Sequence, residues 1–475
     1  MGLAFAVRIP FWGVPLTTDE GGYGEIARLW ARSRTLYDGA WVDRPQGLIL
    51  IFRAVHFVFG GSAEAMRVAA GLAAVLAVAA TMLLTLRLAR GRITACAAGL
   101  LMATAGASPF IEGFTLSGEL LASVPALLSL LAFTAYLGDR RLRWLVLAGL
   151  LTGCAVMVRQ AAFDAGLAAV LFLLLTERRH GIRPAAILTG TAFVPVFAGA
   201  LSAASFSDWW FAVVGYRLQN DSIASGASFM GRLYVFSFSL PYALAGLALL
   251  GLLAGFGWRR APLLARLWVG TALVTVLAGG NFHNHYYIQL VAPLCVIAAI
   301  GLRRIVLTPS RGPQLATAAV ALGTVALTVP LWFMTGNGQA QKLWPKDDHL
   351  QRDAVVARYV KQHTQPHQRI LVMWASASLY YLADREPALR WMWLRNLQTI
   401  EGTAAVAERV LAKRPPALVI GMQPANVLDG TDQALAVLRH DYMLMARVDG
   451  VPIYRPKKTS NTSNAIATSS KTAAP

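Results

Sequence analysis

The sequence predicts a mostly α-helical membrane protein, a bundle of about eleven spans followed by a small α/β domain. Hydrophobic residues make up 56% of the 475 residues and charged residues only 14%, whereas about a quarter of the residues of soluble domains are charged. Long apolar runs recur as far as residue 334, and after Thr335 the pattern changes to short helices and strands. A multi-span protein with one small polar domain accounts for both observations.

Ten apolar runs predict membrane spans. Several reach the roughly 20 residues that a helix needs to cross the hydrocarbon core, and flanking residues complete the shorter ones. The runs are 66–88, 93–111, 116–137, 143–158, 161–176, 184–205, 233–256, 262–279, 285–301 and 314–334.

Arginine clusters occupy every second loop between these runs. Basic residues gather in the cytoplasmic loops of membrane proteins. The net charge of +19 is therefore explained by membrane topology, and no nucleic-acid partner is predicted from it. The loops without clusters, including everything after residue 335, are then extracytoplasmic. The clusters are Arg87, Arg90 and Arg92; Arg140, Arg141 and Arg143; Arg178, Arg179 and Arg183; Arg259, Arg260 and Arg266; and Arg303, Arg304 and Arg311.

The N-terminal segment before Asp19 has only 18 residues, with Arg8 near its middle, and is too short to form a complete membrane span. The alternation of loops still places residue 18 outside, so we expect a first span that is truncated or begins upstream of Met1. The outer loop 19–65 follows. Its apolar segment 47–60 would invert the alternation if it crossed the membrane, and it is therefore predicted to lie in the outer interface.

A domain of residues 336–455 is predicted on the outer face. "QRDAVVARYVKQH" and "GTAAVAERVLAKRPP" have helical periodicity, "RILVMWA" and "ALVIGM" are typical of strands, and "YMLMARVDGVPIYRP" predicts a hairpin. The low-complexity tail 456–475 is predicted to be disordered.

The densest acidic cluster of the chain lies in "PLTTDEGGYGEIARLW", where Asp19, Glu20 and Glu25 follow an apolar run. Two adjacent acids can act as a general base and as a ligand for a hydroxyl or a cation. They can also simply begin a helix that Thr17 or Thr18 caps. The two interpretations are compatible.

"TDEGGYGEIARLW" followed by "WVDRPQGLILIFRAVHFVFGG" resembles the opening of the membrane-embedded glycosyltransferases that use polyprenyl-phosphate sugars, the GT-C class. Lipid A aminoarabinose transferases are the nearest pattern, and protein O-mannosyltransferases are more distant. The matching positions are Asp19, Glu20, Tyr23, Glu25, Ile26, Arg44, Pro45, Phe59 and Gly60.

The resemblance implies transfer of a sugar from a polyprenyl phosphate at the outer membrane interface, with inversion. Asp19 is then the base that deprotonates the acceptor, with Glu20 as the second catalytic carboxylate. Tyr23, Glu25 and Glu119 are predicted to bind the acceptor or the sugar. Glu119 can alternatively be a structural cap at the start of its span, and Glu112 would share its face if that helix continued back.

Cations are needed because negative charge develops on the departing phosphate. Arg44 and Arg159 are predicted to bind it; each can instead be an arginine of the lipid interface. His285 and Tyr286 in "GGNFHNHYYIQLVAPL" are predicted to assist, and a plain aromatic and histidine belt is the alternative.

No cofactor is predicted with certainty, although a divalent cation at the carboxylate cluster fits the acids; no metal ligand set is assigned. The expected partners are a polyprenyl-phosphate sugar, membrane lipids and a lipid, glycan or protein acceptor. The predicted location is the cytoplasmic membrane, with the active site outside. A transporter or flippase of lipid-linked sugars and a non-catalytic membrane anchor are the competing functions.

Overall fold

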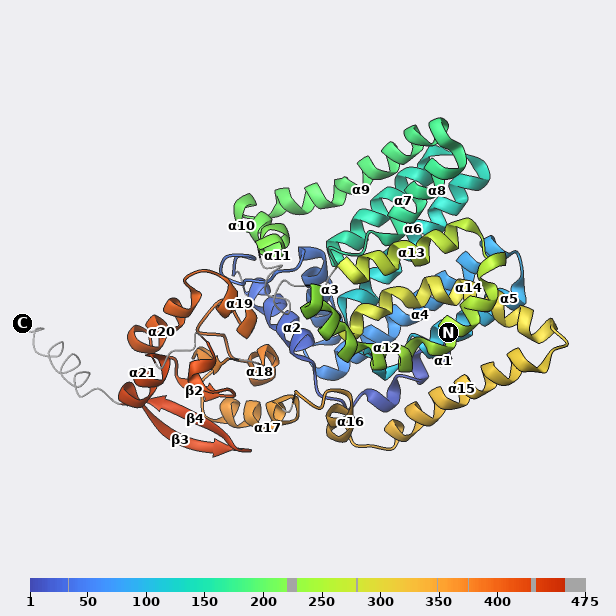
Figure 1. The fold of residues 1–475 in the computed structure, drawn as a ribbon. Coiled ribbons are helices and arrows are strands. Elements are labelled where there is room, and N and C mark those ends of the chain that lie inside the picture. The colour runs from blue at the N-terminus through green and yellow to red at the C-terminus, as the bar shows by residue number, and fades with distance from the viewer. Residues whose placement is uncertain are drawn as a thin grey trace, which may run out of the picture. The chain divides into compact units, whose positions relative to one another are not determined.

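The computed structural model describes residues 1–32, 34–219, 229–278, 281–347, 349–374, 376–428 and 433–457. The chain forms two compact units, which divide after Gln351 (Figure 1). The predicted disordered tail, 456–475, lies almost entirely outside the described residues.

The first unit is helical, and its helices coincide with all ten predicted spans. Within it α6 packs against α4 and α7, and α14 packs against α5, α12 and α13. The elements are α1 (Gly2–Ala6), η1 (Ile9–Phe11), α2 (Thr18–Ala31), α3 (Gln46–Phe59), α4 (Ala63–Ala89), α5 (Arg92–Ala105), η2 (Pro109–Ile111), α6 (Gly118–Asp139), α7 (Leu142–Val158), α8 (Asp164–Glu177), η3 (Arg178–Gly181), α9 (Ile182–Ser202), α10 (Phe206–Trp210), η4 (Phe211–Gly215), α11 (Tyr216–Gln219), α12 (Phe229–Gly257), η5 (Trp258–Arg260), α13 (Leu263–Ala278), η6 (Asn284–Tyr287), α14 (Ile288–Leu307), α15 (Arg311–Trp332) and α16 (Gly336–Leu343).

Length and composition allow many of these helices to cross a membrane. Shorter apolar helices, including α5, α7 and α13, accompany the long ones. The count of about eleven spans stays a prediction, but the segment from α8 to α9 has 39 residues and is broken by η3, which fits two crossings rather than one. In the described part of the chain, six segments are long and apolar enough: Ala63–Ala89, Gly118–Asp139, Asp164–Ser202, Leu233–Arg260, Asn284–Leu307 and Arg311–Trp332.

The N-terminal segment folds as the short pieces α1 and η1 around a buried arginine. Arg8 donates hydrogen bonds to the carbonyl oxygens of Gly113 at 2.9 Å, Gly106 at 2.7 Å and Ala4 at 2.5 Å. A buried guanidinium is tolerated because these main-chain acceptors replace its water. Arg8 thereby fixes the turn between α5 and α6, in which Glu112 lies.

Helix α16 belongs to the first unit, although the composition changes at Thr335. The side chain of Gln339 is fully buried and donates to the carbonyl oxygens of Pro10 and Leu331 at 2.9 and 2.8 Å. Ala340 and Leu343 join a buried cluster with Phe11, Val14, Phe114 and Leu331. The division therefore falls later than the predicted domain boundary at residue 335.

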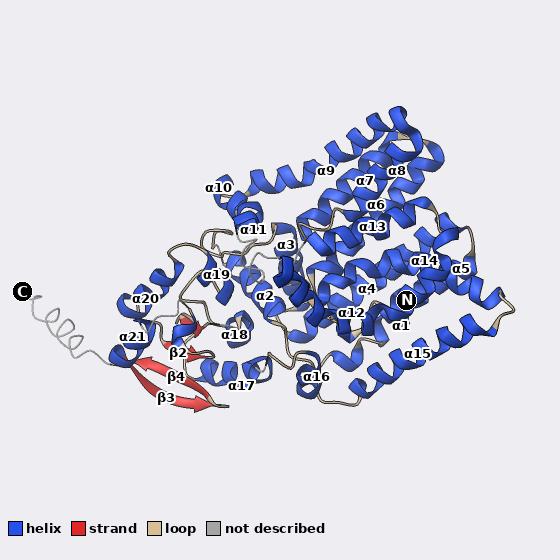
Figure 2. Cartoon of the chain, in the orientation of Figure 1, coloured by secondary structure: helices blue, strands red, loops and turns tan. Residues whose placement is uncertain are grey.

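The second unit is a small α/β domain, as predicted. Its four strands pair in the order β1-β2-β4-β3, with β1 and β2 parallel and the other pairs antiparallel. Figure 2 shows β2, β3 and β4 in red. Asp449 and Gly450 have φ angles of 50° and 77°, which suits the tight hairpin predicted there. The elements are α17 (His349–Gln362), β1 (Ile370–Met373), α18 (Ala377–Ala383), α19 (Leu394–Thr399), α20 (Thr403–Lys413), β2 (Leu418–Gly421), η7 (Ala425–Val427), α21 (Gln433–Asp441), β3 (Tyr442–Val448) and β4 (Val451–Pro456).

Candidate active site

Helix α2 begins at the acidic cluster, and a capping box fixes its first turn. The Thr17 hydroxyl accepts from the backbone N–H of Glu20 at 3.2 Å, and the Glu20 carboxylate accepts from the backbone N–H of Thr17 at 3.1 Å. This reciprocal pair satisfies two otherwise unpaired N–H groups. The predicted capping by Thr17 is therefore present.

Glu20 is buried and its carboxylate serves several partners at once. Besides the cap, it forms an ion pair with Arg67 of α4 and accepts from the backbone N–H of Leu116 at 2.8 Å. Arg67 also donates to the carbonyl oxygen of Val14 at 3.3 Å. Glu20 thus joins α2, α4 and the turn before α6.

Asp19 is only partly buried, whereas Glu20 is buried. Its carboxylate accepts a hydrogen bond from the hydroxyl of Tyr23 at 3.2 Å, one helical turn along α2. Burial raises the pKa of Tyr23, so this phenol stays protonated and able to donate. Asp19 is therefore a partly accessible carboxylate that a neutral donor orients.

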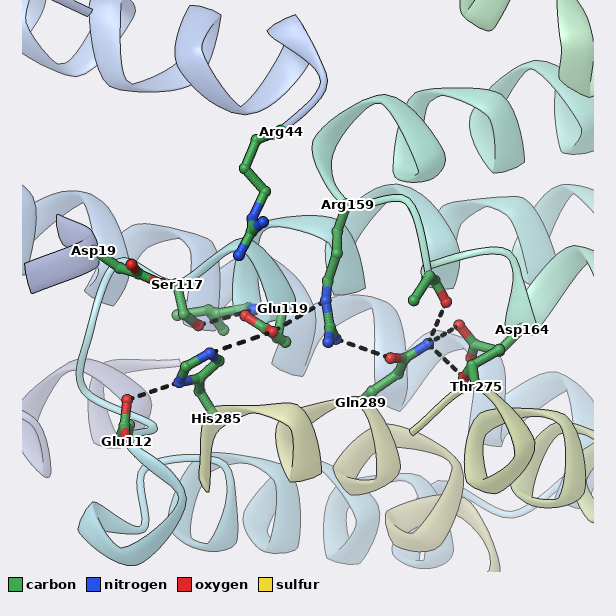
Figure 3. A network of polar contacts seen from close by, with 12 residues as sticks. Asp19, Arg44, Glu112, Ser117, Glu119, Arg159, Asp164, Thr275, His285 and Gln289 are labelled. Atoms are coloured by element: carbon green, nitrogen blue, oxygen red, sulfur yellow. Dashed lines mark hydrogen bonds and ion pairs between the residues drawn. The ribbon is translucent and has the colours of Figure 1, made fainter. Parts of the chain in front are cut away.

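Arg44 directly precedes Pro45, the residue at which α3 is capped, and lies in the loop between α2 and α3. It contacts the carboxylate of Asp43 at 2.8 Å, and Asp43 also contacts Arg217 of α11 at 2.5 Å. The Arg44 guanidinium lies 5.7 Å from the centre of the Tyr23 ring. It points toward the space between Asp19 and Arg159 (Figure 3). Its charge interacts with those of Asp19 and Glu119.

A chain of alternating charges lies beneath this space. The Nε of Arg159 contacts Glu119 Oε1 at 3.0 Å, and the same oxygen lies 3.7 Å from His285 Nε2. His285 Nδ1 lies 2.9 Å from Glu112. The Arg159 guanidinium is also 4.3 Å from the centre of the Tyr286 ring. Four predicted site residues, at the start of α6, just after α7 and in η6, are therefore brought together. Figure 3 shows three of them, Glu119, Arg159 and His285.

Glu112 does not lie on an extension of α6. It adopts a left-handed conformation, with a φ of 58°, at the end of η2. Its carboxylate is turned toward His285, although it is not on a continuous helix with Glu119. Burial alone would raise the pKa of Glu112, but the charge and hydrogen bond of His285, the Trp344 indole and the charge of His283 together lower it.

The network continues into the helices. Arg159 donates to Gln289 Oε1 at 3.0 Å, and the Gln289 amide donates to Asp164 at 2.6 Å and to Thr275 at 2.9 Å. The other Asp164 oxygen accepts from the Trp268 indole at 2.7 Å. Asp164 and Gln289 also line a small cavity beside Arg159 and Glu119. A buried acid is expensive unless it is hydrogen-bonded, and both carboxylate oxygens of Asp164 accept a hydrogen bond.

Glu25 lies near the middle of α2. It is fully buried in α2 and forms an ion pair with Arg28, three residues along the helix. Its predicted role in binding the acceptor or the sugar stays a prediction.

Several polar residues of the site were not predicted. Arg67 and Gln289 lie within apolar runs that the sequence marks only as spans, and Trp344 lies in the stretch that it assigns to the C-terminal domain. Asp43 stands next to Arg44, and this adjacency is a signal that sequence reasoning could have used. Over the described residues, no group of three or more His, Cys, Asp and Glu side chains is arranged to hold a metal ion.

Comparisons with known proteins agree with this architecture. Residues 43–203 match the family model of the dolichyl-phosphate-mannose-protein mannosyltransferases. A search of curated proteins finds no match.

Among solved structures, ArnT from Cupriavidus metallidurans bound to undecaprenyl phosphate is similar, with a TM-score of 0.65 and 17% identity over 95% of this chain and 96% of that chain. The same protein in the apo state gives a TM-score of 0.61 and 15% identity, over 95% and 97% of the two chains. The chain therefore has the fold of ArnT over nearly its whole length, which confirms its predicted resemblance to the membrane-embedded glycosyltransferases of the GT-C class.

Proposed function

We propose that this protein is a membrane glycosyltransferase that moves a sugar from a polyprenyl phosphate to an acceptor hydroxyl. The observation that carries the proposal is the placement of a partly accessible carboxylate, Asp19, where its charge interacts with that of Arg44, which points into the space between Asp19 and a second cation, Arg159 (Figure 3). The undecaprenyl phosphate in the similar ArnT structure supports a lipid-phosphate donor.

Asp19 is the general base in this proposal. It accepts the proton of the acceptor hydroxyl, whose oxygen attacks the anomeric carbon. The bond between that carbon and the phosphate oxygen breaks, and its electron pair leaves with the lipid phosphate. A single displacement inverts the anomeric configuration and requires no covalent enzyme intermediate.

Arg44 and Arg159 stabilise the departing phosphate. Guanidinium groups form paired hydrogen bonds with phosphate oxygens, and donors aimed in advance at developing charge lower the barrier most. Arg159 is well suited to this role because Glu119, Gln289 and the Tyr286 ring already fix its orientation. Tyr286 thus acts on the phosphate through Arg159.

The remaining predicted residues receive narrower roles. Tyr23 orients Asp19 and, with Glu119, faces the sugar or the acceptor. His285 has a carboxylate near each ring nitrogen, so it acts through Glu112 and Glu119 rather than as a direct phosphate ligand. Glu20 holds the start of α2 through Arg67. Glu25 keeps its proposed acceptor or sugar contact as an untested role.

We place the reaction at the outer face of the cytoplasmic membrane, with the second unit also outside. The alternation of arginine-rich loops supports this topology. The outer loop then carries Asp19 and Arg44, and the acceptor approaches from outside. The acceptor is a lipid, a glycan or a protein, and the sugar is a pentose, a hexose or an aminosugar.

The direct test is incubation of the purified protein with a panel of radiolabelled polyprenyl-phosphate sugars and candidate acceptors. Release of free lipid phosphate together with labelled acceptor supports the proposal. A protein that moves intact donor across proteoliposome membranes, and releases no lipid phosphate, is a flippase instead.

A further inference from the structure

We infer that Trp344, which directly follows α16 in the first unit, is a positioning residue of the active site. It acts through Glu112 and His285 on the pair of Glu119 and Arg159. The inference rests on the proposed role of Arg159 in binding the lipid phosphate. Neither the sequence pattern nor the comparisons assign any role to this tryptophan.

Trp344 is itself firmly placed. It follows α16, whose start packs so closely on the N-terminal segment that a Cβ on Gly336 would lie 1.7 Å from the carbonyl oxygen of Gly13. The indole ring packs on the buried cluster that contains Phe114, with ring centres 6.2 Å apart. Its N–H donates to Glu112 Oε1 at 3.1 Å.

Glu112 links Trp344 to His285, and its backbone is fixed by hydrogen bonds. Its N–H donates to the carbonyl oxygen of Pro109 at 3.1 Å, and its own carbonyl accepts from both the N–H and the hydroxyl of Thr115, at 3.0 and 2.8 Å. The two carboxylate oxygens are divided between two partners, Trp344 on one and His285 on the other. The direction of the carboxylate is therefore set from both sides.

His285 carries the constraint to Arg159. With Nδ1 held by Glu112, the ring presents Nε2 toward Glu119 Oε1, at 3.7 Å. The same Glu119 oxygen receives the Nε of Arg159 at 3.0 Å. A rotation of the Glu112 carboxylate would turn the imidazole, remove a positive neighbour from Glu119 and loosen the arginine. Buried polar networks of this kind respond strongly to the loss of one member.

The test is a double-mutant cycle with Trp344→Phe and Arg159→Gln in the full-length protein, using binding of undecaprenyl phosphate in detergent micelles. Phenylalanine keeps the ring packing and removes only the N–H donor. We expect Trp344→Phe to weaken binding about 5- to 30-fold in the wild-type background and less than about twofold in the Arg159→Gln background. The shift in unfolding temperature should be the same in both backgrounds, since packing does not depend on Arg159.

Trp332→Phe, at the exposed end of α15, is the matched control and should leave binding unchanged. Glu112→Gln is a second variant, and it should show the same dependence on Arg159 because it removes the charge that faces His285. Equal losses in both backgrounds, or unchanged binding in Trp344→Phe, would overturn the inference. Binding requires no transfer, so a protein that binds the lipid phosphate but transfers no sugar disproves the proposed function alone.

Discussion

The Glu20 carboxylate and the Arg67 guanidinium form a buried ion pair that joins the start of α2 to the start of α4. Both side chains are nearly inaccessible, at 2% and 1% exposure. The carboxylate also accepts from the N–H of Leu116, so three segments of the chain meet at one charge. The pair therefore places Asp19, which directly precedes Glu20.

Breaking this pair should destabilise the protein strongly. Arg67→Met leaves the buried carboxylate of Glu20 without its cationic partner and is expected to cost about 3–5 kcal/mol of stability. The double variant Glu20→Gln/Arg67→Met removes both charges and should recover most of that loss. Thermal unfolding in detergent measures both, with the exposed Arg53→Met as control. A double variant as unstable as Arg67→Met would show that the unpaired charge of Glu20 does not cause the loss of stability.

Arg44→Ala should weaken binding of the lipid phosphate. Loss of a charged hydrogen bond costs about 1.5–3 kcal/mol, which corresponds to a roughly 10- to 150-fold higher Kd. Arg53→Ala, on the adjacent helix α3, provides the matched control. Titration with undecaprenyl phosphate gives the Kd of each variant. Unchanged affinity in Arg44→Ala and also in the double variant with Arg159→Ala would remove the phosphate role of both arginines.

Glu112 should make the stability of the protein sensitive to acid. Its pKa in the folded protein lies below the ordinary value of 4.5. Its charge therefore stabilises the fold above that ordinary value, and the contribution is lost as the pH falls through the lower, folded pKa. Unfolding temperatures measured between about pH 6 and about pH 3 should fall less steeply in Glu112→Gln. Glu401→Gln, on an exposed turn, should keep the wild-type slope, and an unchanged slope in Glu112→Gln would contradict the assignment.

The second unit should be accessible from outside the cell. A single cysteine at the exposed position Glu401, in a variant in which Cys96, Cys154 and Cys295 are replaced, should react with a membrane-impermeant thiol reagent on intact cells. Reaction only after the membrane is opened would reverse the topology and place the active site on the cytoplasmic side.

The sequence predicted the elements whose signals are local. The apolar runs gave the ten helices because a span needs a continuous stretch of apolar residues. The strands and the hairpin at Asp449 were predicted because period-two patterns and turn residues act over short distances. Helix α16 was assigned to the wrong side of the division because its packing against Phe11 and Leu331 is a contact between distant segments.

The sequence marks individual residues of the candidate site but not the contacts between them. Asp19, Arg44, Glu119 and Arg159 stand out because charged residues are rare near spans. Nothing local indicates that Glu20 meets Arg67, or that Trp344 meets Glu112 across 232 positions. Glu112 shares no helical face with Glu119, because Glu112 adopts a left-handed turn at the end of η2, which ends any helical register.

The role of Asp19 is the central claim, and Asp19→Asn tests it most directly. Thr17 caps α2, so the variant loses only a favourable charge in the first turn, worth about 0.3–1 kcal/mol. Single-turnover transfer and donor affinity should be measured on the same preparation. If Asp19 is the general base, Asp19→Asn should lower the transfer rate about 100-fold or more and keep the donor affinity within about twofold of the wild type. A rate near that of the wild type would contradict the account, because the acidic cluster would then only begin a helix.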